Sequence, residues 1–156
     1  MRIYLIAVGK RMPSWVTEAY EDYAARMPRE CSLELIEVDA GKRGKGADLK
    51  RILAEEGKKL INALPKSCRV ILLDVTGRSF STPKLAEKMQ AWMSDGRDVA
   101  LLVGGPEGLD DSCYQHADER WSLSDLTLPH PMVRVIVSEQ LFRAWSILSN
   151  HPYHRE

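Results

Sequence analysis

Cysteine is scarce in this chain of 156 residues, and long apolar runs are missing. Cys31, Cys68 and Cys113 are odd in number and far apart, and no C-x-x-C pair occurs. This argues against a disulfide framework and a zinc site, and it favours a reducing compartment. No stretch approaches the ~20 apolar residues of a membrane span, and the apolar run at residues 3–8 is too short for a signal peptide. We therefore expect a cytoplasmic protein that does not enter a membrane.

The chain also has no excess of charge of either sign. Lys and Arg together number 22, as do Asp and Glu, so the formal net charge is zero. This argues against a protein that binds free nucleic acid through phosphate attraction alone. The charge is unevenly spread, because residues 1–78 carry 15 basic and 11 acidic residues whereas residues 79–156 carry 7 and 11. One end of the molecule can therefore still attract a polyanion.

Several catalytic signatures are absent. The glycine-rich stretch at residues 104–108 has neither the Lys-Ser/Thr of a P-loop nor the G-x-G-x-x-G of a Rossmann fold. No G-x-S-x-G and no Cys–His pairing stands out, so covalent hydrolase chemistry is poorly supported. His151 and His154 resemble a loose metal pair, but no third ligand at helical spacing accompanies them, so we expect no metal site.

Strand and helix patterns alternate along the chain. The predicted strands are residues 3–8, 33–38, 69–75, 99–103 and 120–123, and the predicted helices are residues 14–27, 48–64, 82–94, 110–119 and 131–149. Ser14, Asp48 and Thr82 are the predicted helix starts, and Gly96 is a predicted stop. With apolar central strands and no linker or repeat, this pattern predicts one α/β domain over residues 1–156. It has a mostly parallel sheet and helices on both faces.

The candidate ligand site is formed by the loops that follow three predicted strands. They are residues 74–77, 104–108 and 124–128. In parallel sheets, ligands sit beyond the carboxyl ends of the strands, so these loops are expected to line one crevice. Glycine allows a ligand to approach the backbone, and side chains at residues 104, 105 and 108 would obstruct such a pocket. A plain strand-to-helix turn is the alternative interpretation of residues 104–108.

Two further segments are candidate contact surfaces. Residues 41–46 are predicted to form a glycine-rich loop with three cations, Lys42, Arg43 and Lys45, which can bind phosphates. A loop that is simply exposed to solvent is the alternative interpretation. The final helix, predicted for residues 131–149, is apolar on nearly all sides. Such a helix must be covered on most sides, so we predict a homodimer through it.

The order of short motifs along the chain resembles that of a known family. The pieces are Ala7-Val-Gly9, Gly41-Lys-Arg-Gly44, Ala47-Asp-x-Lys50, Leu73-Asp74 with Gly77 and Ser81, Gly104-Gly-Pro-Glu-Gly108, Leu123-Ser-x-Leu-Thr-Leu-Pro-His130, Glu139-Gln-x-x-Arg143-Ala144 and Pro152-Tyr-His154. Together they resemble the RlmH family, SPOUT-class methyltransferases of large-subunit ribosomal RNA. The resemblance implies an α/β fold with a C-terminal trefoil knot and a homodimer with its active site at the interface. It also implies methyl transfer from S-adenosylmethionine to N3 of a pseudouridine in 23S rRNA of the assembled ribosome.

The resemblance also suggests roles for particular residues. Cofactor contacts map onto Leu73, Gly104, Leu123, Ser124, Asp125, Leu126, Thr127 and Leu128, to which we add Gly105 and Gly108. Candidates for binding the target base or handling its proton are His130, Arg134, Glu139, Tyr153 and His154. Candidates for RNA contact are Lys42, Arg43, Lys45, Arg143 and Arg155.

Two other function classes stay open at this point. One is a non-catalytic ribosome-associated factor that docks through the basic loop and the C-terminal tail. The other is a nucleotide-dependent hydrolase, which is weakened by the lack of a phosphate-gripping lysine in the glycine loop and of a metal cluster. Only the methyltransferase should bind S-adenosylmethionine and S-adenosylhomocysteine while ignoring ATP.

Overall fold

A five-stranded sheet forms the centre of the computed structural model, which describes residues 1–155. The strands are β1 (Arg2–Val8), β2 (Ser32–Val38), β3 (Arg69–Arg78), β4 (Val99–Val103) and β5 (Glu119–Trp121). They lie in the order β2-β1-β4-β3-β5, and every adjacent pair is parallel. The predicted α/β class with a parallel sheet is confirmed.

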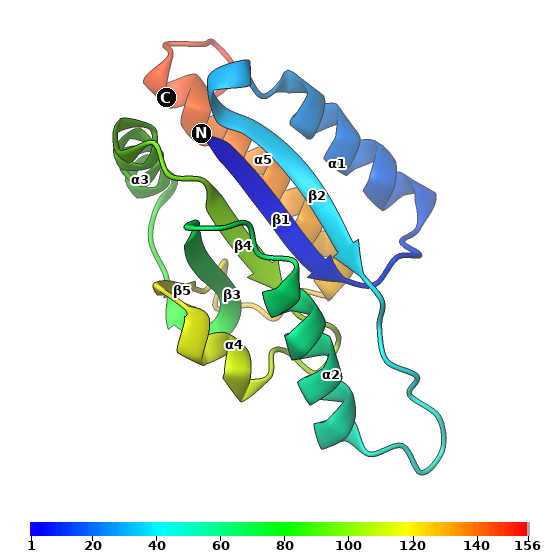
Figure 1. Ribbon diagram of the computed structural model, residues 1–156. Helices are drawn as coiled ribbons and strands as arrows, with labels where there is room; N and C mark the ends of the chain where they lie inside the picture. The colour runs from blue at the N-terminus through cyan, green and yellow to red at the C-terminus, as the bar shows by residue number, and fades with distance from the viewer. Residues whose placement is uncertain (156) are drawn as a thin grey trace.

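Helices cover both faces of this sheet, as predicted. They are α1 (Ser14–Arg26), a 3-10 turn η1 (Arg29–Cys31), α2 (Leu49–Asn62), α3 (Thr82–Asp95), α4 (Asp111–His116) and α5 (His130–Leu148). The core on one face includes residues of α1, α3 and α5, and the core on the other includes residues of α2 and α4. Figure 1 shows α5 running behind β1 and β2, with α2 and α4 on the nearer side.

Strands β1 and β4, inside the sheet, are mostly apolar because both of their faces are covered. In β1, Ile3 and Leu5 belong to one core while Ile6 and Val8 belong to the other. All five residues of β4 are buried. A strand that is covered on both sides has no solvent face to alternate with, which explains the continuous apolar runs in the sequence.

Local signals located all five predicted helices, but several helix ends differ from the prediction. The Asp48 side chain accepts a hydrogen bond from the backbone N–H of Arg51, and Gly96 ends α3 with a φ of 81°, as predicted. Ser14, however, is the first residue of α1, which has no side-chain cap. Ser81, rather than Thr82, caps α3 by accepting from a backbone N–H in its first turn. These two starts differ by a single residue, within the usual uncertainty of a helix end. By contrast, α4 ends at His116, three residues before its predicted end.

Strand β3 extends beyond its predicted end, so residues 74–77 are a bulged strand rather than a free loop. Leu73 and Arg78 both pair with Trp121, and the residues between them bulge. A Cβ on Gly77 would lie 2.5 Å from the carbonyl carbon of Trp121, so only glycine permits this close approach. The bulge still leaves Asp74 at the carboxyl edge of the sheet.

Helix α5 leaves part of its apolar surface uncovered. Met132 is 37% exposed, Val135 and Ile136 are only partly buried, and Trp15 at the start of α1 is 53% exposed. No helix within residues 1–155 combines the length and hydropathy needed to cross a membrane. The homodimer and the trefoil knot stay predictions.

Candidate functional site

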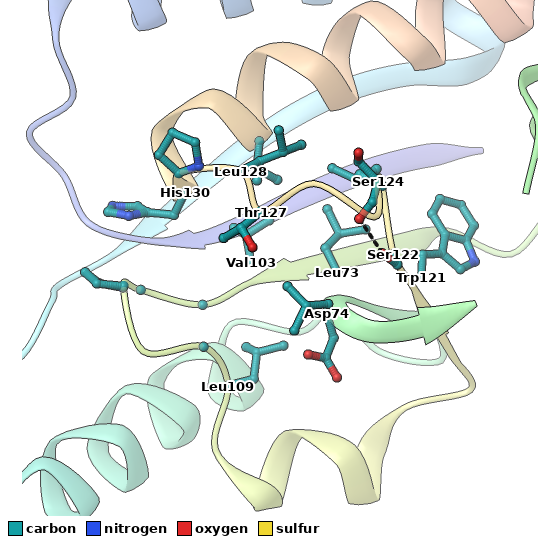
Figure 2. Close-up of a pocket in the computed structure, with 18 of the residues that line it drawn as sticks. Leu73, Asp74, Val103, Leu109, Trp121, Ser122, Ser124, Thr127, Leu128 and His130 are labelled. Atoms are coloured by element: carbon teal, nitrogen blue, oxygen red, sulfur yellow. Dashed lines mark hydrogen bonds between the residues drawn. The ribbon is translucent and has the colours of Figure 1, made fainter. Parts of the chain in front are cut away.

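The segments that follow β3, β4 and β5 surround a cavity of about 890 Å³. Because the strands are parallel, these segments all leave the sheet at one edge. Figure 2 shows the loop after β4 and the loop before α5 facing each other across the strand ends. The cavity volume is typical of a small-molecule site.

The cavity is lined by nine of the ten residues predicted to contact a cofactor. They are Leu73, Gly104, Gly105, Gly108, Leu123, Ser124, Leu126, Thr127 and Leu128. Asp125 is the exception, since it is exposed and does not line the cavity. The structure thus brings together residues from three separate segments of the chain at one place.

The glycines of the 104–108 loop allow the loop to close on itself. A Cβ on Gly104 would collide with the carbonyl oxygen of Gly108. Gly108 has a φ of +90°, and its N–H donates to the Gly105 carbonyl oxygen over 3.0 Å. We expected side chains at 104 and 108 to obstruct a ligand. The structure gives a different reason for glycine, which is the tight turn of the loop itself.

The loop between β5 and α5 is held by serine hydroxyls. Ser122 Oγ donates to the Ser124 carbonyl oxygen over 3.0 Å, and Ser124 Oγ accepts from the Leu126 N–H over 2.9 Å. No backbone hydrogen bond described within residues 1–155 uses the N–H of Thr127 or Leu128. Main-chain donors are therefore available where this loop meets the cavity.

Of the five residues predicted to handle the target base, only His130 lines the cavity. It is the first residue of α5, and Figure 2 shows its ring above the glycine loop. Burial lowers the pKa of His130, and the positive charges of Arg134 and Arg43 lower it further. The ring is therefore neutral at pH 7 and has one nitrogen that can accept a proton.

Arg134 does not line the cavity, and its contacts join elements of the fold. Its side chain is 2% exposed, and its Nη1 lies 2.6 Å from Glu37 Oε2 on β2. Its Nη2 donates to the Gly9 carbonyl oxygen over 2.7 Å, just beyond β1. Arg134 therefore fixes the first turns of α5 to the carboxyl ends of two strands.

Glu139, Arg143 and Tyr153 form a second polar cluster on α5 and the C-terminal tail. Glu139 Oε1 accepts from the Tyr153 hydroxyl over 2.8 Å and from Arg143 Nη2 over 2.6 Å. The Arg143 guanidinium carbon lies 5.0 Å from the centre of the Tyr153 ring. His154 Nδ1 lies 3.1 Å from Ser146 Oγ. None of these residues lines the cavity within one chain.

The predicted RNA-contact residues differ in their surroundings. Lys42, Lys45 and Arg155 are exposed. Arg43 is instead paired with Glu56 and Glu107, and Arg143 belongs to the cluster with Glu139. Among residues 1–155, no group of His, Cys, Asp or Glu side chains is arranged to hold a metal ion.

Comparison with known proteins decides the family. A family model described as a predicted SPOUT methyltransferase matches residues 1–154. The chain belongs to the SPOUT methyltransferase family. It is 62% identical, over the full length of both proteins, to the ribosomal RNA large subunit methyltransferase H of Thioalkalivibrio sulfidiphilus (strain HL-EbGR7).

A solved structure shares the fold of this chain at low sequence identity. A probable methylase family protein from Haemophilus influenzae Rd KW20 superposes with a TM-score of 0.56. The match covers 97% of this chain and 68% of that one at 17% identity, so it concerns the fold alone.

Asp74, which belongs to the predicted 74–77 segment, and Tyr114, which the sequence did not single out, both line this cavity. Asp74 Oδ2 accepts from Thr76 Oγ1 over 2.6 Å and from the Tyr114 hydroxyl over 2.7 Å. Burial raises the pKa of Asp74, but these hydrogen bonds outweigh it, and the pKa lies below its ordinary value. A carboxylate directly after an apolar strand was a usable signal for Asp74. Tyr114 had none, because only the packing of α4 brings it to the cavity.

Proposed function

We propose that this chain transfers a methyl group from S-adenosylmethionine to N3 of a pseudouridine in 23S rRNA of the assembled ribosome. The observation that carries this proposal is the full-length similarity to the ribosomal RNA large subunit methyltransferase H described above. Every segment that lines the cavity lies within that match. Membership of the family supports methyl transfer as the reaction, and the name of the relative indicates large-subunit ribosomal RNA as the class of substrate.

The cavity fits the proposed cofactor in size, polarity and charge. Leu73, Val103 and Leu128 provide apolar walls that suit a purine ring, and the backbone N–H groups of residues 127 and 128 can meet its polar edge. The carboxylate of Asp74 favours a positively charged ligand. When bound, S-adenosylmethionine supplies a methyl group activated by its sulfonium.

His130 is the proposed proton acceptor. N3 of a pseudouridine is an imide nitrogen, which must lose its proton to accept a methyl group. A neutral imidazole in the cavity wall can take that proton as a general base. Arg134 supports this role indirectly, because it holds the first turn of the helix that carries His130.

We also propose that the active protein is a homodimer. A second copy would cover the exposed parts of Trp15 and Met132 and the half-buried apolar residues of α5. It would also bring Glu139, Tyr153 and His154, which do not line the cavity of their own chain, towards the site of the partner. A monomeric mass at micromolar concentration in light scattering would refute this part of the proposal.

The remaining features complete the proposal. Residues 1–156 act as one cytoplasmic domain, with the trefoil knot of the family at the C-terminal end. Lys42, Lys45 and Arg155 contact RNA phosphates, and the zero net charge suits recognition of a preassembled particle rather than naked RNA.

The decisive experiment measures transfer of labelled methyl from S-adenosylmethionine to ribosomes that lack the modification, with naked 23S rRNA alongside. Label on N3 of a pseudouridine in the ribosome, and none on naked RNA, is the expected result. Binding of S-adenosylmethionine without transfer to either RNA would leave the fold assignment standing and refute the substrate. Ribosome binding without cofactor binding would instead favour the docking factor, and a preference for ATP would favour the hydrolase.

A further inference from the structure

A single guanidinium joins the basic loop, helix α2 and the glycine loop of the cavity. Arg43 Nη1 lies 2.8 Å from Glu56 Oε2 on α2. Its Nε donates to Glu107 Oε1 over 3.0 Å, and its Nη2 donates to Glu107 Oε2 over 2.8 Å. Its Nη1 also donates to the Gly41 carbonyl oxygen over 2.9 Å. Arg43 therefore connects a loop that is exposed to solvent with a loop that lines the cavity.

Glu56 anchors this connection. It is 2% exposed, and its Oε2 also accepts from the backbone N–H of Gly41 over 2.8 Å. A buried carboxylate is strongly unfavourable without a cationic partner. Moving Arg43 onto an RNA phosphate would remove that partner from Glu56 and from Glu107 together, so Arg43 is poorly suited to grip RNA.

Glu107 is the other end of the connection. It lies in the glycine loop and lines the cavity. The guanidinium also lies close to the backbone of this loop, because a Cβ on Gly105 would be 3.0 Å from Arg43 Nη2. Two parallel bonds from a planar guanidinium fix the orientation of a carboxylate. The glycine loop, which is otherwise closed by its own Gly108–Gly105 hydrogen bond, is thereby tied to α2.

We propose that Arg43 is a positioning residue of the cofactor cavity: it holds the glycine loop, through Glu107, in the shape that receives the cofactor. In this arrangement the neighbouring lysines, Lys42 and Lys45, meet the RNA, and Arg43 does not. This replaces the expectation that Arg43 binds phosphate. The inference rests on the proposed function for the identity of the cofactor, but not for the contacts themselves.

The test separates cofactor affinity from ribosome affinity in four variants of the full chain. Isothermal titration with S-adenosylmethionine is applied to wild type, Arg43→Ala, Glu107→Ala, the double variant and Lys42→Ala. Arg43→Ala and Glu107→Ala should each raise the Kd on the order of tenfold. The double variant should bind the cofactor no more weakly than the single variants, because each single substitution already removes the same Arg43–Glu107 interaction. Lys42→Ala removes the same charge from the same loop, and it should weaken ribosome binding while leaving the cofactor Kd unchanged.

A second measurement needs no cofactor. Amide hydrogen exchange in the ligand-free protein should be faster at residues 105–108 in Arg43→Ala and Glu107→Ala, and unchanged in Lys42→Ala. Glu107→Ala is the safer variant, because it leaves the pairing of Arg43 with buried Glu56 intact.

The outcomes distinguish this inference from the proposed function. If wild type binds S-adenosylmethionine and both variants match it in affinity and exchange, Arg43 does not position the loop. If Arg43→Ala loses ribosome affinity like Lys42→Ala with an unchanged cofactor Kd, Arg43 is an RNA contact after all. If wild type does not bind S-adenosylmethionine, the proposed function fails, and the exchange rates of the ligand-free protein still decide whether Arg43 holds the loop.

Discussion

Replacing Arg134 by methionine tests whether this residue supports the fold or takes part in the chemistry. Methionine keeps much of the length of the side chain but removes its charge. The change breaks the 2.6 Å ion pair with Glu37 and the 2.7 Å hydrogen bond to the Gly9 carbonyl oxygen. Both contacts join the start of α5 to the edge of the sheet at which the cavity lies.

The expected loss of stability follows from the burial of the two partners. Removing one member of a buried ion pair typically costs about 3–5 kcal/mol. Glu37 is 31% exposed, so water solvates it when Arg134 is gone, and the lower end of that range applies. Arg134 Nε is buried without a hydrogen-bond partner, and removing it recovers about 1 kcal/mol. We therefore expect a net loss of about 2–3 kcal/mol, or roughly 4–12 °C in Tm for a protein of this size.

The assay is equilibrium unfolding in urea at pH 7 and fixed protein concentration, because dimerisation would make stability depend on concentration. Arg51→Met is the matched control, since the Arg51 side chain is 78% exposed and its pairing with Glu55 stabilises little. The reasoning is refuted if Arg134→Met unfolds within about 0.5 kcal/mol of wild type but has lost methyl transfer. Arg134 would then act on the substrate rather than on the fold.

Three further predictions concern the cavity. Gly104→Ala should abolish cofactor binding, because its Cβ collides with the Gly108 carbonyl oxygen; titration that matches wild type would contradict this. Asp74→Asn should weaken the binding of S-adenosylmethionine roughly 3- to 10-fold more than that of S-adenosylhomocysteine, because only S-adenosylmethionine carries a positively charged sulfonium. Calorimetric titration with both ligands checks this prediction. The folded state binds the proton of His130 more weakly than the unfolded state, because the folded pKa is lowered. Stability should therefore fall as the pH drops below about 6.5, and His130→Gln should flatten that part of the stability profile measured by urea unfolding.

Local periodicity determined much of the fold from the sequence. Apolar runs marked β1 and β4 as strands, and Asp48 and Gly96 marked helix ends. Parallel strands end at a common edge, and this rule correctly predicted that residues 104–108 and 124–128 meet around one cavity. These features depend on neighbouring residues and on general sheet geometry, so a single sequence contains them.

Pairing between distant side chains was decided by the tertiary structure. Arg43 and Glu107 are 64 residues apart, and the sequence, which suggested an RNA contact for Arg43, did not reveal their ion pair. Arg134 was a candidate for the chemistry, but it is buried between α5 and the ends of two strands. Its partners there, Gly9 and Glu37, lie 125 and 97 positions away in the sequence. Tyr114 reaches Asp74 across 40 residues because α4 packs beside β3.

The difference has a simple physical origin. A charged or aromatic residue keeps the same local pattern whether it faces solvent, a ligand or a partner on another element. Its role is set by the order of the strands and the packing of the helices, which bring particular partners within a few ångströms. The sequence alone determined where a ligand can approach the sheet, and the tertiary structure decided which side chains meet it and which hold the walls in place.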